Sequence, residues 1–110
     1  CFNVKLEHMK EVHILSEEEI MDFIILNPDW SYEGTTLQAK FKFTDFLVAM
    51  QVVQELAVIA EEMNHHPEWT NVYNNLSIRL CTHEVGNMVT SLDRILAERI
   101  SKIVAKQKNN

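Results

Sequence analysis

The sequence predicts an α+β fold, with a four-stranded antiparallel sheet and three helices packed on one face of it. Two stretches of the chain alternate apolar and polar residues with the period of two that half-buried strands show. Three other stretches repeat apolar residues at helical spacing. The resulting order is α-β-β-α-β-β-α, and hairpins interleaved with helices favour an antiparallel sheet with its helices on one side. A length of 110 residues suits a single domain.

The first predicted helix begins at a capping signal. Residues 1–15 have no clear period and are expected to form a loosely docked leader, with the domain spanning 16–110. Ser16 followed three residues later by Glu19 has the pattern of a capping box, in which each side chain binds the backbone N–H of the other. The dipeptide Asn27-Pro28 should end the helix, because a residue before proline avoids the helical region.

A hairpin and a long helix follow. Gly34 permits the hairpin turn, and Thr44-Asp45 can cap a helix that runs to about Met63. In the second hairpin strand, Leu37, Ala39, Phe41 and Phe43 alternate with Gln38, Lys40 and Lys42. The helix carries two apolar stripes, so we expect the sheet on one side and either another helix or a second copy on the other. The first stripe is Phe46, Ala49, Met50, Val53, Leu56, Ala57 and Ala60, and the second is Val48, Val52 and Ile59.

The second hairpin comprises "TNVYN" and "LSIRLCTH". We predict its turn at Asn74-Asn75, because Asn tolerates positive φ. On the second strand, Ile78, Leu80 and Thr82 should share a face. Thr90 or Ser91 should cap the last helix, which should end before a frayed tail at 106–110. The inward residues of this helix are expected to be Leu92, Leu96, Ile100 and Ile103.

Composition and charge exclude several classes of protein. Hydrophobic residues make up 46% and charged residues 24%, as in ordinary globular domains, and no apolar run approaches the ~20 residues that span a bilayer. The net charge of -6 argues against binding to phosphate backbones. Two cysteines, Cys1 and Cys81, favour a reducing, cytoplasmic setting over a disulfide framework.

Three of the five histidines lie in a distinctive context. His65 and His66 precede Pro67 just after the long helix, and His83 lies at the end of the last strand. Imidazole both donates and accepts protons near neutral pH, which suits a dehydration in which a hydroxyl leaves as water and a proton is lost elsewhere. Glu61, about one helical turn before His65, could orient an imidazole. His8 and His13 are expected to be ordinary surface residues.

Other interpretations of these residues remain open at this point. Three histidines with Glu61 could bind zinc or iron, although adjacent histidines rarely share one ion and no H-x-x-x-H or H-x-H spacing is present. Cys81 could act as a nucleophile beside His83, but a small half-buried strand residue is the simpler interpretation. Trp69 and Tyr73 could stack on a flat heterocycle, although packing roles are more common for such aromatics.

The stretch "AEEMNHHPEWTNVYNNLSIRLCTHE", residues 60–84, resembles the signature of the pterin-4a-carbinolamine dehydratases. The stretches "YEGTTLQAKFKFTDF" and "TSLDRILAERI" resemble that family's first hairpin and final helix, so the resemblance covers about 16–105. It implies three helices on a four-stranded antiparallel sheet. It also implies removal of water from 4a-hydroxytetrahydropterin to give quinonoid dihydropterin, in tetrahydrobiopterin recycling, without a metal or an organic cofactor.

The resemblance also assigns roles to residues. His65 and His83 match proton-transfer positions, and His66 matches a position that binds substrate, with a further acid role open to it. The predicted substrate-binding residues are Glu61, Asn64, Pro67, Cys81, Thr82, Glu84 and Asp93. Asn64 stands where animal members often carry Asp, so a carboxylate role is lost there. The segment between Glu84 and Asp93 is one residue longer than in those proteins.

Two functions follow from this resemblance. The first is the dehydratase, and the second is an interaction module that stabilises dimers of a helical partner, as animal members do for a homeodomain transcription factor. Members of the family are commonly dimers or tetramers. We therefore expect a homodimer or homotetramer that forms through the long helix and a sheet edge, with no direct nucleic-acid or membrane contact. A nuclear as well as cytoplasmic location would accompany the second role.

Overall fold

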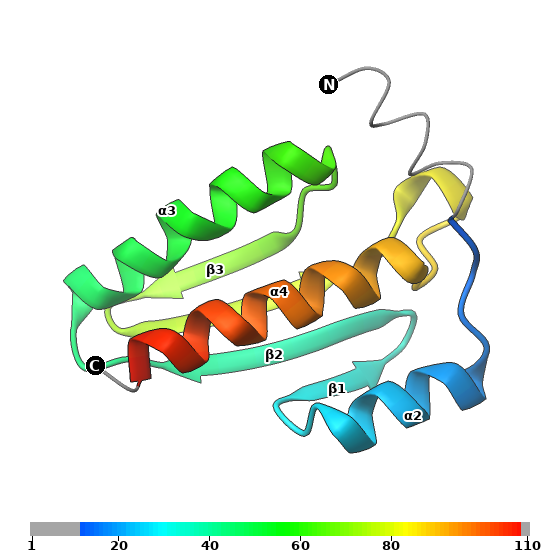
Figure 1. Ribbon diagram of the computed structural model, residues 1–110, viewed down its shortest axis with the longest axis horizontal. Helices are drawn as coiled ribbons and strands as arrows, with labels where there is room; N and C mark the ends of the chain where they lie inside the picture. Colours follow the sequence, from blue (N-terminus) through cyan, green and yellow to red (C-terminus); the bar gives the residue numbers. More distant parts are fainter. Residues whose placement is uncertain (1–11, 109–110) are drawn as a thin grey trace.

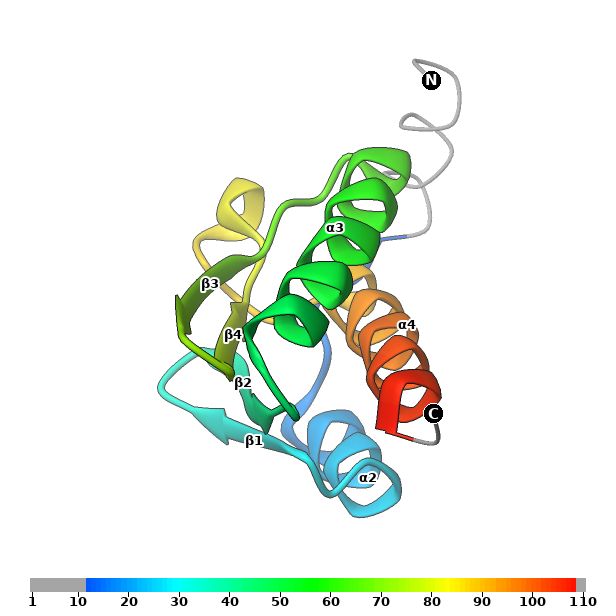
Figure 2. The ribbon, with the colours of Figure 1, turned by 90° about the vertical axis from the view of Figure 1, so that its left-hand side faces the viewer.

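The computed structural model describes residues 12–108, and it confirms the predicted architecture (Figure 1). One four-stranded antiparallel sheet has the order β1-β2-β4-β3. Helices α2, α3 and α4 all lie on one face of this sheet, as Figure 2 shows. The elements are α2 Glu17–Leu26, β1 Trp30–Glu33, β2 Thr36–Lys42, α3 Phe46–Met63, β3 Glu68–Val72, β4 Asn75–Leu80, the 3₁₀ helix η1 His83–Val85, and α4 Ser91–Lys108.

Strict alternation along the two central strands separates the core from the open face of the sheet. Every second residue of β2 and β4 is buried against the helices, and the residues between them face the other way. The predicted inward set of the first hairpin is confirmed. The fully buried centre of the core combines Leu37, Leu76, Ile78 and Leu80 from the sheet with Val52, Leu56, Leu96 and Ile100 from the helices.

Helix α2 begins as predicted. Ser16 accepts a hydrogen bond from the Glu19 backbone N–H, and the Glu19 carboxylate accepts one from the Ser16 backbone N–H, which completes the capping box. Three residues of the predicted leader belong to the packed structure, because 13–15 pair with 89–91 through backbone hydrogen bonds. His13 is half exposed, as expected for a surface histidine. The predictions for Cys1 and His8 fall outside the described residues.

Helix α3 has the predicted bounds and begins at an Asp45 cap, but the two predicted stripes do not form two separate faces. In the second stripe, Val52 is completely buried, and Val48 and Ile59 pack against the core. In the first stripe, Phe46 and Ala57 are exposed. The buried set is Ala49, Val52, Leu56, Ala60 and Met63, whose steps of three and four residues follow one face of the helix. Leu47 and Val58 are the large apolar side chains that α3 leaves most exposed.

The second hairpin turns one residue earlier than predicted. Its turn is Tyr73-Asn74, and the positive φ of 55° falls on Tyr73 rather than on an asparagine. Asn74 is instead buried, where its side-chain amide donates to the Phe43 carbonyl at 2.8 Å. This contact explains the shift, because a buried amide that binds backbone outweighs the preference of asparagine for positive φ.

The C-terminal helix is longer than predicted. Thr90 accepts a hydrogen bond from the Leu92 N–H, as expected of one of the two candidate caps, and α4 continues through Lys106 to Lys108 rather than fraying at 106. Leu92, Leu96 and Ile100 are buried as predicted, and Ile103 is half-buried. Across residues 12–108, no helix has the length and apolar character needed to cross a bilayer.

Candidate active site

A cavity of about 270 Å³ opens on the helix-free face of the sheet, at the end where three loops meet. In β4, Arg79 lies between the buried residues Ile78 and Leu80 and therefore points away from the helices. The turn between β1 and β2 and the start of β3 complete this end of the sheet. The lining residues are Thr35, Thr36, His66, Glu68, Arg79, Cys81, His83 and Asn87. Two of the three predicted catalytic histidines therefore meet at one cavity.

His66 reaches the cavity because of the backbone on both sides of it. Asn64 ends α3 in the left-handed conformation, with φ 50°, which asparagine tolerates well. Pro67 then restricts His66 to extended backbone. The Nε2–H of His66 donates to the Glu61 carboxylate at 2.7 Å. Glu61 therefore orients an imidazole, as expected, although the partner is His66 rather than His65.

His83 belongs to η1 and not to the end of β4, which stops at Leu80. Its Nδ1 makes a hydrogen bond with the side-chain oxygen of Asn87. Because an amide oxygen only accepts, Nδ1 carries the hydrogen, and Nε2 is the unprotonated nitrogen of the neutral ring. Asn87 can hold this position because it takes a positive φ of 63° just after Gly86. Residues 83–87 thus form a compact loop that presents His83.

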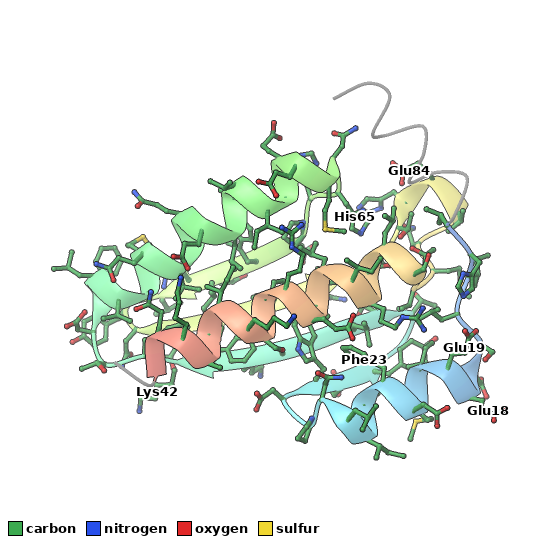
Figure 3. All side chains as sticks on the ribbon, in the orientation of Figure 1. Glu18, Glu19, Phe23, Lys42, His65 and Glu84 are labelled. Atoms are coloured by element: carbon green, nitrogen blue, oxygen red, sulfur yellow. The ribbon has the colours of Figure 1, made fainter. Side chains whose placement is uncertain are left out.

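His65 lies apart from the other two imidazoles. Only 7% of its surface is exposed, and its Nε2–H donates to the Asp93 carboxylate at 2.6 Å. Figure 3 shows His65 where the end of α3, the segment with Glu84 and the start of α4 meet. Adjacent side chains on extended backbone point to opposite sides, so His66 faces the cavity while His65 faces the interior. The structure therefore brings two predicted imidazoles to the cavity and leaves the third beneath the surface.

Asp93 is the centre of a buried hydrogen-bond network. In addition to His65, the completely buried Asp93 carboxylate accepts from the Thr82 hydroxyl and from the Thr90 backbone N–H, each at 2.9 Å. The hydroxyl oxygens of Thr82 and Thr90 lie 2.7 Å apart. Thr82 immediately precedes His83, and His65 immediately precedes His66. A single carboxylate on α4 therefore fixes both chain segments that carry the cavity histidines.

Cys81 lines the cavity, and its surroundings favour the protonated thiol. Burial raises its pKa, and the charges of Asp93 and Glu68 raise it further, against a smaller opposing effect of Arg79. A raised pKa disfavours the thiolate, which is the nucleophilic form. The arrangement therefore speaks against Cys81 as a nucleophile. Among the described residues, no three His, Cys, Asp or Glu side chains gather closely enough to hold a metal ion.

The remaining predicted residues have mixed positions. Glu84 is exposed on η1, and Asn64 is exposed at the end of α3. Thr82 and Asp93 belong to the buried network. Trp69 packs against the core, and Tyr73 lies at the opposite end of β3 from His66, so neither aromatic is at the cavity.

Sequence reasoning missed several residues that line the cavity. Arg79 was interpreted as a solvated strand residue, and no role was given to Glu68 or Asn87. For Arg79 a usable signal existed, because it alternates with the inward residues of β4. The missed residues are Thr35, Thr36, Glu68, Arg79 and Asn87.

Comparison with known proteins identifies the family. The model of the family described as "Pterin 4 alpha carbinolamine dehydratase" matches residues 13–103 of this chain. The chain belongs to the pterin-4a-carbinolamine dehydratase family. A protein of Prochlorococcus marinus strain AS9601, named for this dehydratase, is 39% identical over 93 residues, which are 84% of this chain and 96% of the relative. A protein of Opitutus terrae with the same name is 39% identical over 90 residues, covering 82% of this chain and 93% of the relative.

Solved structures agree with this assignment. The crystal structure of a "transcriptional coactivator/pterin dehydratase" from Brucella melitensis matches with a TM-score of 0.79 and 33% identity, covering 84% of this chain and 99% of that chain. A pterin dehydratase-like protein described as a RuBisCO assembly factor of the alpha-carboxysome matches with a TM-score of 0.60 and 22% identity, covering 69% and 89%. The latter shares the fold. Family membership confirms the expected enzyme class, a hydro-lyase acting on a pterin carbinolamine.

Within this dehydratase, adjacent residues of the stretch 60–84 have different tasks. His66 and His83 line the cavity, whereas His65 and Thr82, which precede them, bind the buried Asp93 carboxylate. The residue pairs His65-His66 and Thr82-His83 thus each combine one buried anchor with one exposed imidazole. Such a design holds the imidazoles on a rigid frame while leaving them open to a ligand.

Proposed function

We propose that the cavity dehydrates 4a-hydroxytetrahydropterin by general acid–base catalysis with His66 and His83. The reaction breaks the C4a–O bond and removes the proton from N5, so that a C4a=N5 double bond forms and water leaves. It requires one group that donates a proton and one that accepts a proton on either side of the reacting atoms. Two imidazoles that face one cavity from opposite loops satisfy this requirement.

His83 suits the role of base. Its Nδ1–H is engaged by Asn87, so the free Nε2 of the neutral ring can accept the N5 proton. The electron pair of the N5–H bond then forms the double bond to C4a. Asn87 acts as a positioning residue, because it selects the tautomer and does not itself move a proton.

His66 suits the role of acid. The Glu61 carboxylate at 2.7 Å provides a negative partner for the imidazolium form, and Nδ1 is then free to protonate the departing hydroxyl. This assignment gives His66 the proton-transfer role that the resemblance implied for His65, and it uses the acid role that the resemblance left open to His66. Its basis is that the His65 Nε2 is held by Asp93 in the interior, so His65 acts by positioning its neighbour.

The observation that carries the proposal is the meeting of His66 and His83 at one cavity. Replacing either with Ala should lower kcat about 10²-fold or more, the usual contribution of a proton-transfer group. The assay follows the disappearance of 4a-hydroxytetrahydropterin by absorbance, with subtraction of the spontaneous reaction. His13→Ala, an exposed histidine outside the cavity, is the matched control. Full activity in both cavity variants would refute the proposal.

The proposed reaction needs only protons from the side chains, so we propose that no metal and no organic cofactor takes part. Activity should therefore survive dialysis against a chelator. Its product, a quinonoid dihydropterin, is the form that reduction returns to the tetrahydropterin, so we further propose a role in recycling that cofactor. Accumulation of carbinolamine-derived pterins in cells that lack the protein would support this role.

A second candidate function is supported by the outer face of α3. Leu47 and Val58 are 71% and 60% exposed, and they lie about three helical turns apart on one side of the helix. We propose that this face binds a second copy of the chain or a helical partner. Leu47→Glu and Val58→Glu should shift the gel-filtration volume toward the monomer if copies associate here. If the parent protein elutes as an oligomer and these variants elute at the same volume, the contact between copies lies elsewhere, for example at a sheet edge.

A further inference from the structure

Two opposite charges that the proposed chemistry does not use lie inside the same cavity. Glu68 and Arg79 are direct partners across β3 and β4, and the Arg79 guanidinium lies 3.7 Å from the Glu68 carboxylate. The Glu68 side chain is 74% exposed and the Arg79 side chain is 54% exposed. An ion pair this exposed adds little to the stability of the fold, so folding alone does not explain its position in the cavity.

The order of groups along the cavity is fixed by the strands. His66 lies two residues before Glu68, ahead of the start of β3, and Cys81 and His83 follow Arg79 beyond the end of β4. Two residues of extended chain cover about 7 Å. The charged pair therefore occupies one end of the cavity, and the two imidazoles occupy the other.

The hydrogen-bonding groups of a pterin match this order of groups in the cavity. In a pterin, the 2-amino group lies directly across the pyrimidine ring from C4a, where the hydroxyl leaves. The edge that carries the 2-amino group and N3–H presents two parallel donors, and the neighbouring O4 is an acceptor. A carboxylate accepts two parallel N–H bonds, and a guanidinium donates to a carbonyl oxygen.

We propose that Glu68 and Arg79 are the specificity-determining residues of this site, with Glu68 accepting from the 2-amino group and N3–H of the pterin and Arg79 donating to O4. This inference rests on the proposed function, because it orients the C4a hydroxyl toward His66 and His83. The same arrangement rejects a ring whose C2 carries an oxygen, because that oxygen would face the carboxylate without a hydrogen between them.

The test compares equilibrium binding of pterin and of lumazine, the same bicyclic ring with oxygen in place of the 2-amino group, by ligand fluorescence. The parent protein should bind pterin at least tenfold more tightly. Glu68→Gln should reduce or reverse this preference, because an amide both accepts from N3–H and donates to the C2 oxygen. Arg79→Met should weaken both ligands and leave their ratio nearly unchanged. Glu62→Gln, which alters an exposed carboxylate paired with Arg99 at 3.1 Å on the helical side, is the matched control and should change neither affinity.

The outcomes separate this inference from the proposed function. A parent that binds and dehydrates pterins, but whose pterin-to-lumazine ratio is the same after Glu68→Gln, overturns the role of Glu68 and leaves the histidine chemistry standing. A ratio that depends on Glu68, in a protein without dehydratase activity, supports the inference and overturns the chemistry. A parent that binds neither ligand overturns both.

Discussion

His65 and Asp93 are joined in the interior by a hydrogen bond of 2.6 Å, beneath the cavity-facing His66. Removing the charge of a buried carboxylate that accepts several hydrogen bonds costs about 2–3 kcal/mol. We expect Asp93→Asn to lower the free energy of unfolding by this amount, measured by urea denaturation, and to lower kcat as well. Asp29→Asn, at an exposed position, serves as the control. An Asp93→Asn protein as stable as the parent would show that the network does not anchor the site.

Asn87 should matter for turnover more than for binding. Asn87→Gly keeps the positive φ without strain and removes the amide that holds the His83 Nδ1–H. We expect kcat to fall about tenfold, less than the ~10²-fold or greater loss expected for His83→Ala, with the affinity for pterin retained. Asn87→Asp, which still offers an accepting oxygen, should restore most of the rate. Equal rates in the Gly variant and the parent would mean that His83 needs no fixed tautomer.

The rate should depend on pH through the imidazole base. Protonation of the His83 Nε2 removes the lone pair that accepts the N5 proton, so the base becomes inactive as the solution becomes acidic. We expect kcat/KM to drop about tenfold per pH unit on the acidic side, and His83→Ala should abolish this limb of the profile. The profile is measured from pH 5 to 9 with the spontaneous reaction subtracted. A flat profile across that range would contradict acid–base catalysis by histidine.

The Cys81 thiol should be slow to react. Because burial raises its pKa above the ordinary value, the thiolate fraction at pH 7–8 is smaller than in a free cysteine, and alkylation should accelerate only at higher pH. The experiment measures the rate of reaction with iodoacetamide in a Cys1→Ser background, against N-acetylcysteine as reference. Cys81→Ser should retain the dehydration rate. A thiol that reacts faster than the reference at pH 7 would reopen the nucleophile interpretation.

Much of the fold could be predicted because each element carries its own local signal. The capping box at Ser16, the Asp45 cap and the alternation in β2 are properties of a few neighbouring residues, and each proved correct. The buried face of α3 was harder to predict, because a helix that is apolar on two sides fits more than one orientation. Val52 was grouped with the second stripe, whereas the packing of the helices places it in the centre of the core.

The site was harder to predict, because it depends on register and on tertiary contacts. A turn at Asn74-Asn75 would have paired Arg79 with Thr70, whereas the observed turn pairs it with Glu68. A one-residue error in a turn thus hid the charged end of the cavity. His65 and His66 are adjacent in the sequence, which does not show that they face opposite sides. The direction of the backbone after Asn64 turns the His65 ring inward and the His66 ring toward the cavity.

The position of Asp93 on α4 has a consequence for how the protein becomes active during synthesis. The residues that line the cavity all precede α4 in the chain, yet the carboxylate that secures their loops lies 28 positions after His65. The loop that carries His66 is translated well before the helix that clamps it leaves the ribosome. Catalytic competence should therefore appear abruptly and late, after the C-terminal helix has docked, and a nascent chain stalled before that point should remain inactive.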